Sequence, residues 1–105
     1  MPPDGDKIEI ENVNIPGRTE RLDRVKYEAA RNALVSVLPT GAPGLTMEEA
    51  KASLIPLLPD ALFPGGAKAG WWLKAAQLDL EAKGVVQREK TKPMRLHLAK
   101  QRTQP

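Results

Sequence analysis

The C-terminal third of the chain combines a helix-forming segment with two short β-type runs and a cationic turn. The helical segment covers residues 67–83 and ends at Gly84. The runs cover residues 85–89 and 94–98, and the turn between them reads Lys90-Thr91-Lys92-Pro93. Alternating runs bounded by turn residues are typical of paired strands. This order constrains the fold most, because it predicts a helix whose end leads directly into a basic β-hairpin.

Successive side chains of a strand point to opposite faces, so the sequence predicts which residues of this hairpin face the helices. In the second run Met94, Leu96 and Leu98 alternate with polar residues, so we expect them to face the helices. In the first run Val86 is the expected inward residue, although a slip of one residue would reverse the assignment.

Two further helices are predicted before residue 67. The first begins near Asp23, a good N-cap residue, and runs to about residue 38, with apolar residues at three- and four-residue intervals. The second begins with the capping box Thr46-Met47-Glu48-Glu49 and covers about residues 47–55, because Pro56 interrupts it. Residues 59–66 then form a long connection.

The helical segment 67–83 is apolar over most of its circumference. At 100° per residue it leaves one narrow solvated stripe, which we expect to hold Ala67, Gly70, Lys74, Gln77 and Glu81. Asp79 falls inside the apolar arc, where an unpaired charge is costly. We interpret it as half of a structural ion pair with Arg88 or Arg95 in preference to a catalytic acid.

The N-terminal segment is acidic and rich in proline and glycine. Residues 7–13 alternate like a short strand, but no partner strand is evident. We expect this strand to add to the hairpin edge or to another subunit, or to stay disordered. The predicted organisation is an acidic arm at 1–18, one domain at 19–98 and a basic tail at 99–105.

Composition argues against several classes of function. The 105 residues suit a single core, and a chain without cysteine has no disulfide framework or thiolate metal site. His97 is the only histidine, and we interpret it as a surface-facing or hydrogen-bonded strand residue because no motif places a catalytic partner beside it. We therefore expect no enzyme activity, no metal site and no cofactor. Without an apolar run of about 20 residues or a signal peptide, a cytoplasmic location without membrane contact is expected.

The net charge of +3 hides a gradient along the chain. Residues 1–20 carry five acids against two bases, whereas residues 83–105 carry seven bases against one acid. A basic C-terminal third is the footprint of a polyanion-binding face, although a solvated hairpin would look the same. The amides at the start of the helix, with Lys68, could also hold one phosphate. The candidate double-stranded DNA contacts are Lys68, Gly70, Lys74, Gln77, Arg88, Lys90, Thr91 and Lys92.

Residues 66–84, followed by Arg88-Glu89 and residues 92–96, resemble a winged-helix domain. The chain is also similar to a small, uncharacterised family of bacterial winged-helix-like proteins that keep a segment like Asn14-Ile15-Pro16-Gly17-Arg18. The resemblance covers most of residues 8–98. It implies an α+β fold, a three-helix winged helix-turn-helix with a C-terminal β-hairpin wing, but no reaction or ligand. The acidic extension and the long connection at 59–66 depart from a typical DNA-binding regulator.

Two functions from different classes remain open. One is a DNA-binding module, such as a small transcriptional regulator, that uses its third helix and basic wing. The alternative is a protein–protein interaction or dimerisation module that uses Trp71 or Trp72 without DNA. Because these tryptophans differ by 100° on the helix, we expect one of them to be buried and the other partly exposed.

Overall fold

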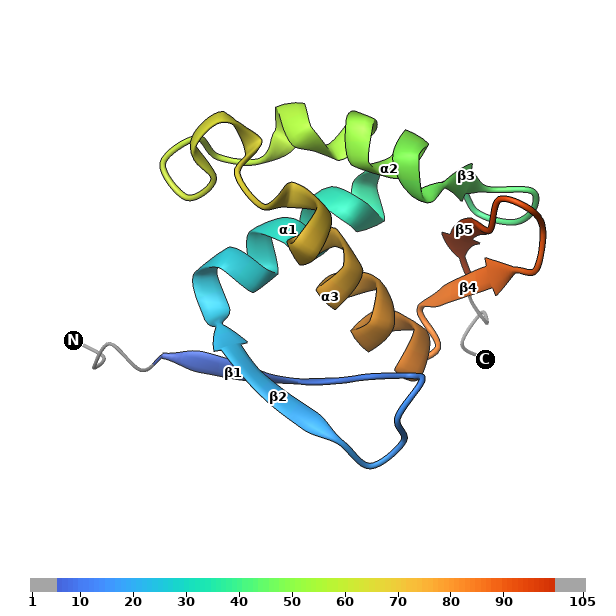
Figure 1. Ribbon diagram of the computed structural model, residues 1–105, viewed down its shortest axis with the longest axis horizontal. Helices are drawn as coiled ribbons and strands as arrows, with labels where there is room; N and C mark the ends of the chain where they lie inside the picture. The colour runs from blue at the N-terminus through green and yellow to red at the C-terminus, as the bar shows by residue number, and fades with distance from the viewer. Residues whose placement is uncertain (1–5, 100–105) are drawn as a thin grey trace, which may run out of the picture.

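The computed structural model describes residues 6–99 and has an α+β architecture with three α-helices and two small sheets (Figure 1). A two-stranded sheet pairs β1 with β2, and a three-stranded sheet has the order β3-β5-β4. Figure 1 shows α3 between the β1–β2 hairpin and α1, with β4 and β5 beyond its C-terminal end. In chain order the elements are β1 (Lys7–Glu11), β2 (Thr19–Asp23), α1 (Arg24–Val37), β3 (Leu45–Thr46), α2 (Met47–Leu54), α3 (Ala69–Ala82), β4 (Val86–Glu89) and β5 (Arg95–Leu98).

The starts of α1 and α2 are set by the predicted capping residues. The Asp23 side chain accepts a hydrogen bond from the amide of Lys26 at 2.9 Å. In the capping box before α2, the Glu49 amide donates to the Thr46 hydroxyl at 3.1 Å, and the Thr46 amide donates to the Glu49 carboxylate at 3.0 Å. Both N-cap predictions are therefore confirmed.

The helix α2 ends at Leu54, and a single 3-10 turn, Ile55–Leu57, continues the chain. Pro56 lies in this turn because it has no amide to donate to an α-helical ladder. A second short turn, Pro64–Gly66, precedes α3. Phe63, just before that second turn, is only 2% exposed and anchors the connection to the core.

The C-terminal end of α3 is closed by a Schellman motif. Gly84 has a φ of +78°, as expected of a left-handed cap. Its amide donates to the carbonyl of Glu81 at 3.2 Å, and the amide of Val85 donates to the carbonyl of Leu80 at 2.8 Å. The motif provides hydrogen-bond donors to carbonyls at the helix end that would otherwise lack partners, and the chain continues directly into β4.

The strands β4 and β5 form the predicted antiparallel pair. Val86 lies opposite Leu98, and Arg88 lies opposite Leu96. Val86 is 2% exposed and Leu96 is fully buried, so the inward assignment of both residues is confirmed. The two-residue strand β3, which the sequence did not predict, pairs with the other edge of β5.

The expectation that the N-terminal strand adds to the edge of the C-terminal hairpin or to another subunit, or stays disordered, is wrong. β1 pairs antiparallel with β2, with Ile10 opposite Glu20 and Glu11 opposite Thr19. Ile10 is 4% exposed and packs into the core. The boundary expected at residue 18 thus falls between two paired strands. Residues 1–5 of the expected arm and 100–105 of the expected tail lie outside the described part.

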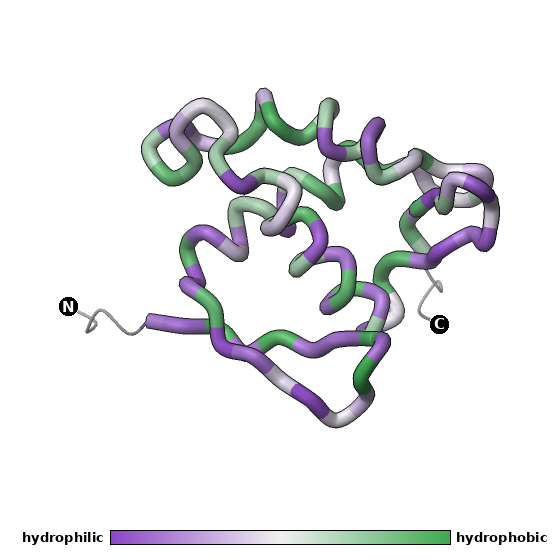
Figure 2. The backbone as a smooth tube through the Cα atoms, in the orientation of Figure 1, coloured by the Kyte–Doolittle hydropathy of each residue, from purple (hydrophilic) through white to green (hydrophobic). Residues whose placement is uncertain are grey.

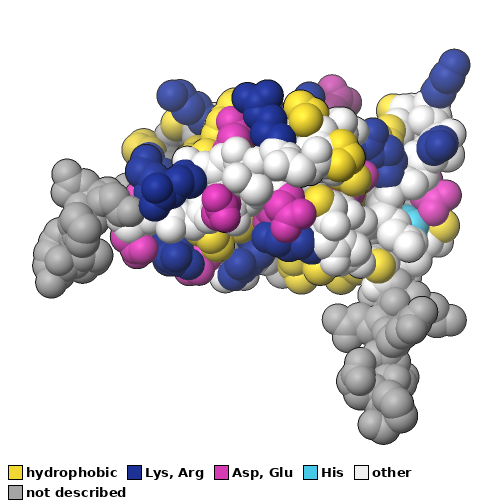
Figure 3. Space-filling view, turned by 90° about the horizontal axis from the view of Figure 1, so that it is seen from below, with side chains coloured by type: hydrophobic (Ala, Val, Ile, Leu, Met, Phe, Trp, Pro, Cys, Tyr) yellow, Lys and Arg dark blue, Asp and Glu magenta, His cyan; other side chains and the backbone are white. Residues whose placement is uncertain are grey.

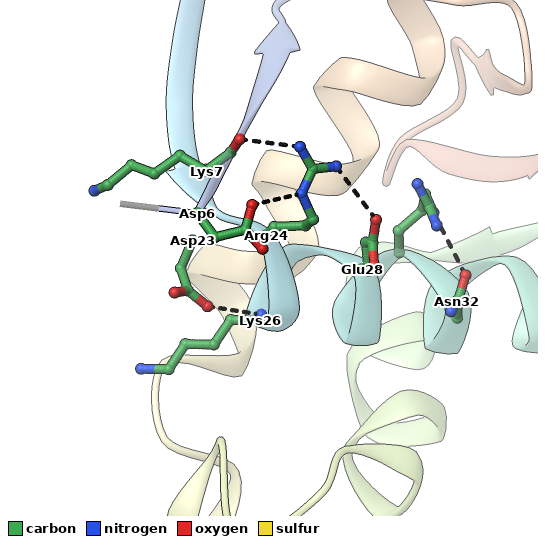
Figure 4. A network of polar contacts seen from close by, with 8 residues as sticks. Asp6, Lys7, Asp23, Arg24, Lys26, Glu28 and Asn32 are labelled. Carbon is green, nitrogen blue, oxygen red and sulfur yellow. Dashed lines mark hydrogen bonds and ion pairs between the residues drawn. The ribbon is translucent and has the colours of Figure 1, made fainter. Parts of the chain in front are cut away.

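Arg24 fastens β1 to the start of α1 (Figure 4). Its guanidinium donates to the Asp6 carboxylate at 3.0 Å and to the Lys7 carbonyl at 3.2 Å, and Glu28 lies 3.7 Å away. The hydrogen bond to the Asp6 carboxylate raises the pKa of Arg24. The N-terminal strand is therefore attached through side chains as well as through its ladder.

The core lies where α1, α2, α3 and the strands meet. Hydropathy along the backbone shows hydrophobic segments converging there, whereas the turn between β4 and β5 is hydrophilic (Figure 2). The largest fully buried side chains include Tyr27, Phe63, Leu34 and Leu73. Within residues 6–99, no helix combines the length and apolar character needed to span a bilayer.

Candidate nucleic-acid interface

The predicted contacts at the start of α3 lie at the surface. Lys68 is exposed and is the N-cap of α3, with a left-handed φ of +59°. Lys74, one and a half turns further on, is also exposed. Gly70 is half-buried, and the side chain of Lys51 on α2 passes over it, with Nζ 3.6 Å from the place that a Cβ at this position would take. The start of α3 therefore carries lysines from two helices.

The prediction that Gln77 lies on a solvated stripe is wrong. Gln77 is 2% exposed, and its side-chain amide donates to the Glu81 carboxylate. That carboxylate also accepts two hydrogen bonds from Arg88, both at 3.0 Å. Gln77 is thus buried, and the guanidinium of Arg88, whose side chain is 31% exposed, is engaged by Glu81.

The open side of α3 is rotated relative to the predicted stripe. Trp71 is 52% exposed and shares this side with Lys74, whereas Leu78 and Ala75 are half-buried. The helix is apolar nearly all round, so hydropathy alone is a poor predictor of which of its sides faces solvent. The side turned to solvent is decided by what packs on the others.

The turn between β4 and β5 presents the remaining predicted contacts. Lys90, Thr91 and Lys92 are all exposed. The Thr91 hydroxyl donates to the carbonyl of Pro93 at 2.6 Å, and the Thr91 amide donates to the carbonyl of Glu89 at 2.8 Å. The backbone of the turn is therefore held in shape while both ammonium groups face solvent.

Asp79 is structural, as interpreted, but neither Arg88 nor Arg95 is its partner. Its carboxylate is 1% exposed and lies 2.7 Å from the ammonium of Lys83. It also accepts hydrogen bonds from the Tyr27 hydroxyl and, at 2.8 Å, from the Glu11 amide. Burial and the nearby carboxylate raise the pKa of Tyr27, which keeps its hydroxyl protonated as a donor. The group links α3 to α1 and β1.

His97 is a buried, hydrogen-bonded residue of β5. Its Nε2 lies 2.8 Å from the Glu89 carboxylate and its Nδ1 lies 3.0 Å from the Leu98 carbonyl, so both ring nitrogens face acceptors. An imidazole satisfies two acceptors only when both nitrogens carry protons. The hydrogen bond to Glu89, followed by the one to the Leu98 carbonyl, raises the pKa of His97 accordingly.

Ion pairing divides the charges of the C-terminal half into two groups. The acids of residues 67–98 are each paired: Asp79 with Lys83, Glu81 with Arg88, and Glu89 with His97. Four lysines of the same stretch form no ion pair within residues 6–99, namely Lys68, Lys74, Lys90 and Lys92. Positive charge without a compensating acid therefore remains at the start of α3 and at the β4–β5 turn.

The β1–β2 hairpin limits how much of α3 is accessible. The Val13 amide donates to the carbonyl of Leu78 at 3.3 Å, and a cavity of about 230 Å³ between hairpin and helix is lined by Ile15, Arg18, Ala75 and Leu78 among others. Acidic and basic side chains lie side by side on this face of the molecule (Figure 3). An approaching polyanion would thus meet a mixed surface here, and the N-terminal half of α3 is the more open part.

Sequence reasoning missed Lys26 and Lys51 as neighbours of this surface. Lys26 on α1 lines a hollow with Lys68, Trp71 and Trp72, and Lys51 on α2 covers Gly70. Their convergence depends on how three helices pack, and no local pattern in the sequence encodes it.

Comparison with known proteins gives a family and no function. Residues 7–96 match the model of a family described as "Family of unknown function (DUF6958)". The chain belongs to this family. No curated protein and no solved structure matches the chain. The matched range contains the β1–β2 hairpin, all three helices and every residue of the candidate interface, and it ends within β5.

Proposed function

We propose that this DUF6958 protein is a winged helix-turn-helix domain that binds double-stranded DNA through the start of α3 and the β4–β5 turn. The order α1-β3-α2-α3-β4-β5, with a sheet ordered β3-β5-β4, agrees with that of a winged helix. In such a domain the third helix enters the major groove and the wing contacts the neighbouring backbone. The β1–β2 hairpin is an addition to this plan.

The observation that carries the proposal is that the acids of residues 67–98 form ion pairs, whereas four lysines of this stretch form none within residues 6–99. Glu81 would repel phosphate if its charge were open, but Arg88 neutralises it and Gln77 covers it. The four unpaired lysines then dominate the local field. Phosphate neutralisation by lysine supplies most of the sequence-independent affinity of DNA-binding proteins.

The contacts divide by position. Lys90 and Lys92 lie on the turn, where they would neutralise backbone phosphates, and Thr91 would add a neutral phosphate contact. Lys74 lies on the open side of α3, where it can reach base edges in the groove. Lys68 and Lys51 flank the start of α3 and would meet the adjacent strand.

The proposal is tested by the salt dependence of binding to a labelled blunt duplex of random sequence. Substituting Lys90→Gln and Lys92→Gln together should weaken binding and reduce the slope of log affinity against log salt by about two. The matched control removes two charges from the β1–β2 hairpin, Arg18→Gln with Arg21→Gln, and should leave the slope unchanged. Equal slopes for the two double variants, or no binding of the duplex at low salt, would contradict the proposal.

A second candidate function, protein binding, is favoured by one observation. Trp71 exposes 52% of its surface although it belongs to the residue types that anchor interfaces. A homodimer or a partner protein could cover it. Light scattering measures the mass of the wild-type chain and of Trp71→Ala. An assembly larger than a monomer that dissociates on this substitution, together with no retention on duplex, would favour the second function.

A further inference from the structure

A hollow between α1 and the start of α3 combines two tryptophans with two lysines. Its volume is about 450 Å³, and it is lined by Lys26, Lys68, Trp71 and Trp72. We call it the tryptophan notch. None of its lining residues is acidic, and it lies away from the β4–β5 turn, at the opposite end of α3.

The rings of the notch are held in fixed orientations. Phe63, which is 2% exposed, packs edge-on against Trp72 with ring centroids 6.0 Å apart and an interplanar angle of 81°. Trp72 in turn packs edge-on against Trp71, with centroids 4.9 Å apart at 78°. The buried phenylalanine thus supports the half-buried Trp72, which supports the exposed Trp71. An exposed ring with a supported position is a ready surface for stacking.

The two lysines bring positive charge to the same hollow from different elements. Lys26 belongs to the first turn of α1, and Lys68 is the N-cap residue of α3. The Asp23 carboxylate is occupied by the backbone amide of Lys26, while the Lys26 side chain extends away from the Arg24 network (Figure 4). Neither ammonium forms an ion pair in the described part of the chain.

We propose that the tryptophan notch binds an unpaired nucleobase of a DNA strand, with the base stacked on Trp71 and its flanking phosphates on Lys26 and Lys68. Every base offers a π-face, and a base–aromatic stack beside cations is the usual mode of single-strand binding. The notch offers a matching group to each part of a nucleotide. The aromatic ring of Trp71 would contact the base, and the ammonium groups of Lys26 and Lys68 would contact the phosphates of the backbone. An apolar peptide side chain would use the ring and leave the two cations unmatched.

This inference rests on the proposed function and makes it more specific. A duplex read by α3 would continue past the start of the helix as a single strand into the notch. The preferred ligand is then a duplex with a single-stranded extension, and such a ligand should bind more tightly than a blunt duplex of equal length. Of the notch residues only Lys68 is shared with the proposed duplex contacts, and the stacking residue Trp71 is not, so the two modes of binding can be separated experimentally through Trp71.

The first measurement uses a short thymidine oligonucleotide and the intrinsic fluorescence of the tryptophans. Stacking should quench the fluorescence of the wild-type chain. Trp71→Ala should weaken binding of the oligonucleotide by roughly 5- to 150-fold, the range that one base–aromatic stack gives. Trp71→Phe should retain part of the affinity because a ring face remains. Leu57→Ala is the matched control, since Leu57 is 53% exposed and lies outside the notch.

The second measurement removes the notch cations. Lys26→Gln with Lys68→Gln should reduce the salt slope for the oligonucleotide by about 1.4, the value for two phosphates of a single strand. Circular dichroism checks that each variant is folded. The same variants are titrated with the blunt duplex, where the loss caused by Trp71→Ala should be small.

The outcomes separate the two proposals. Quenching that is lost in Trp71→Ala, with duplex affinity kept, supports the notch. Quenching by the oligonucleotide without any duplex binding also supports the notch and overturns the duplex proposal alone. Duplex binding without quenching, or with oligonucleotide affinity equal in Trp71→Ala and Leu57→Ala, overturns the notch alone. A chain that binds neither probe but assembles through Trp71 overturns both and assigns the ring to a protein interface.

Discussion

Removing the buried carboxylate of Asp79 should destabilise the whole fold. This group accepts hydrogen bonds from the Tyr27 hydroxyl and the Glu11 amide and lies 2.7 Å from the Lys83 ammonium. Asp79→Ala leaves the hydroxyl and the amide without an acceptor at a site that is 1% exposed. The side chain of Lys83 is 39% exposed, so its ammonium group can be hydrated by water in the variant. The loss of its ion pair with Asp79 therefore adds little to the destabilisation.

The magnitude follows from the two orphaned donors. A hydrogen bond to a charged acceptor stabilises by about 1.5–3 kcal/mol, and breaking a buried charged cluster costs about 3–5 kcal/mol. We therefore expect Asp79→Ala to lower the free energy of unfolding by about 3–5 kcal/mol. Asp79→Asn keeps the volume and an acceptor oxygen, so it should cost only about 1–2 kcal/mol.

Urea denaturation followed by tryptophan fluorescence measures both variants, because Trp71 and Trp72 lie on the same helix as Asp79. Asp6→Asn is the matched control. That carboxylate is 45% exposed, and its removal should cost no more than about 1 kcal/mol, because an exposed ion pair contributes little. In hydrogen exchange, the Glu11 amide should exchange faster in Asp79→Ala than in the wild type. An Asp79→Ala variant within about 1 kcal/mol of the wild type would refute the reasoning, because buried donors would then have found other partners.

Two further predictions concern β5 and the loop before β3. Because the folded-state pKa of His97 is raised by Glu89, its contribution to stability is present below the unfolded pKa and is lost as the pH rises through the folded value. The urea midpoint should therefore fall as the pH rises from the unfolded pKa of about 6.5 through the raised folded pKa, and His97→Gln should remove that part of the fall. An unchanged pH profile in the variant would contradict the assignment. Gly44→Ala should destabilise by more than about 2 kcal/mol, because its φ is +82° and a Cβ would overlap the carbonyl of Leu96. Gly41→Ala, at a φ of +96° with nothing within 4 Å, should cost only about 1 kcal/mol. Thermal melting compares the two glycine variants, and equal losses would show that the contact is relieved by movement.

The helix ends could be predicted from the sequence because their causes are local. Asp23 and Thr46 each accept a hydrogen bond from an amide three residues away, and Pro56 and Gly84 stop helices through their own backbone chemistry. The strands β4 and β5 were also predictable, because Val86 and Leu96 mark their inward faces. In each case the signal and the structure it determines lie within a few residues.

The strand β2 could not be predicted because its signal is not local. Residues 19–23 read Thr-Glu-Arg-Leu-Asp, with Leu22 as the only apolar side chain. Nothing in this run favours a strand, and its conformation is set by the ladder with β1. The Glu11 amide was missed as a partner of Asp79 for a related reason, because it lies 68 positions away along the chain. The ion-pair partner Lys83 lies only four positions away, so its helical spacing was a local signal that could have identified it.

The orientation of α3 was predicted with an error that matters for the candidate site. Centring the open stripe on Lys74 placed Gln77 in solvent, but Gln77 is buried. Of the two tryptophans, which were expected to differ in burial, Trp71 is the exposed one and Trp72 is half-buried. The sequence shows that the helix is apolar nearly all round, but not that Arg88 draws Glu81 and Gln77 inward. The lysines of the β4–β5 turn were correctly expected at the surface, because a polar turn needs no tertiary information to be exposed.

The bidentate contact between Arg88 and Glu81 has a consequence for the entropy of association. It joins β4 to the last turns of α3, so the strand that carries the β4–β5 turn cannot swing independently of the helix. Ordering a loose segment on binding consumes part of the interaction free energy. Here the backbone that presents Lys90 and Lys92 is already fixed before any ligand arrives. In the proposed complex with DNA, the conformational freedom to be lost at this turn would then be mainly that of the lysine side chains.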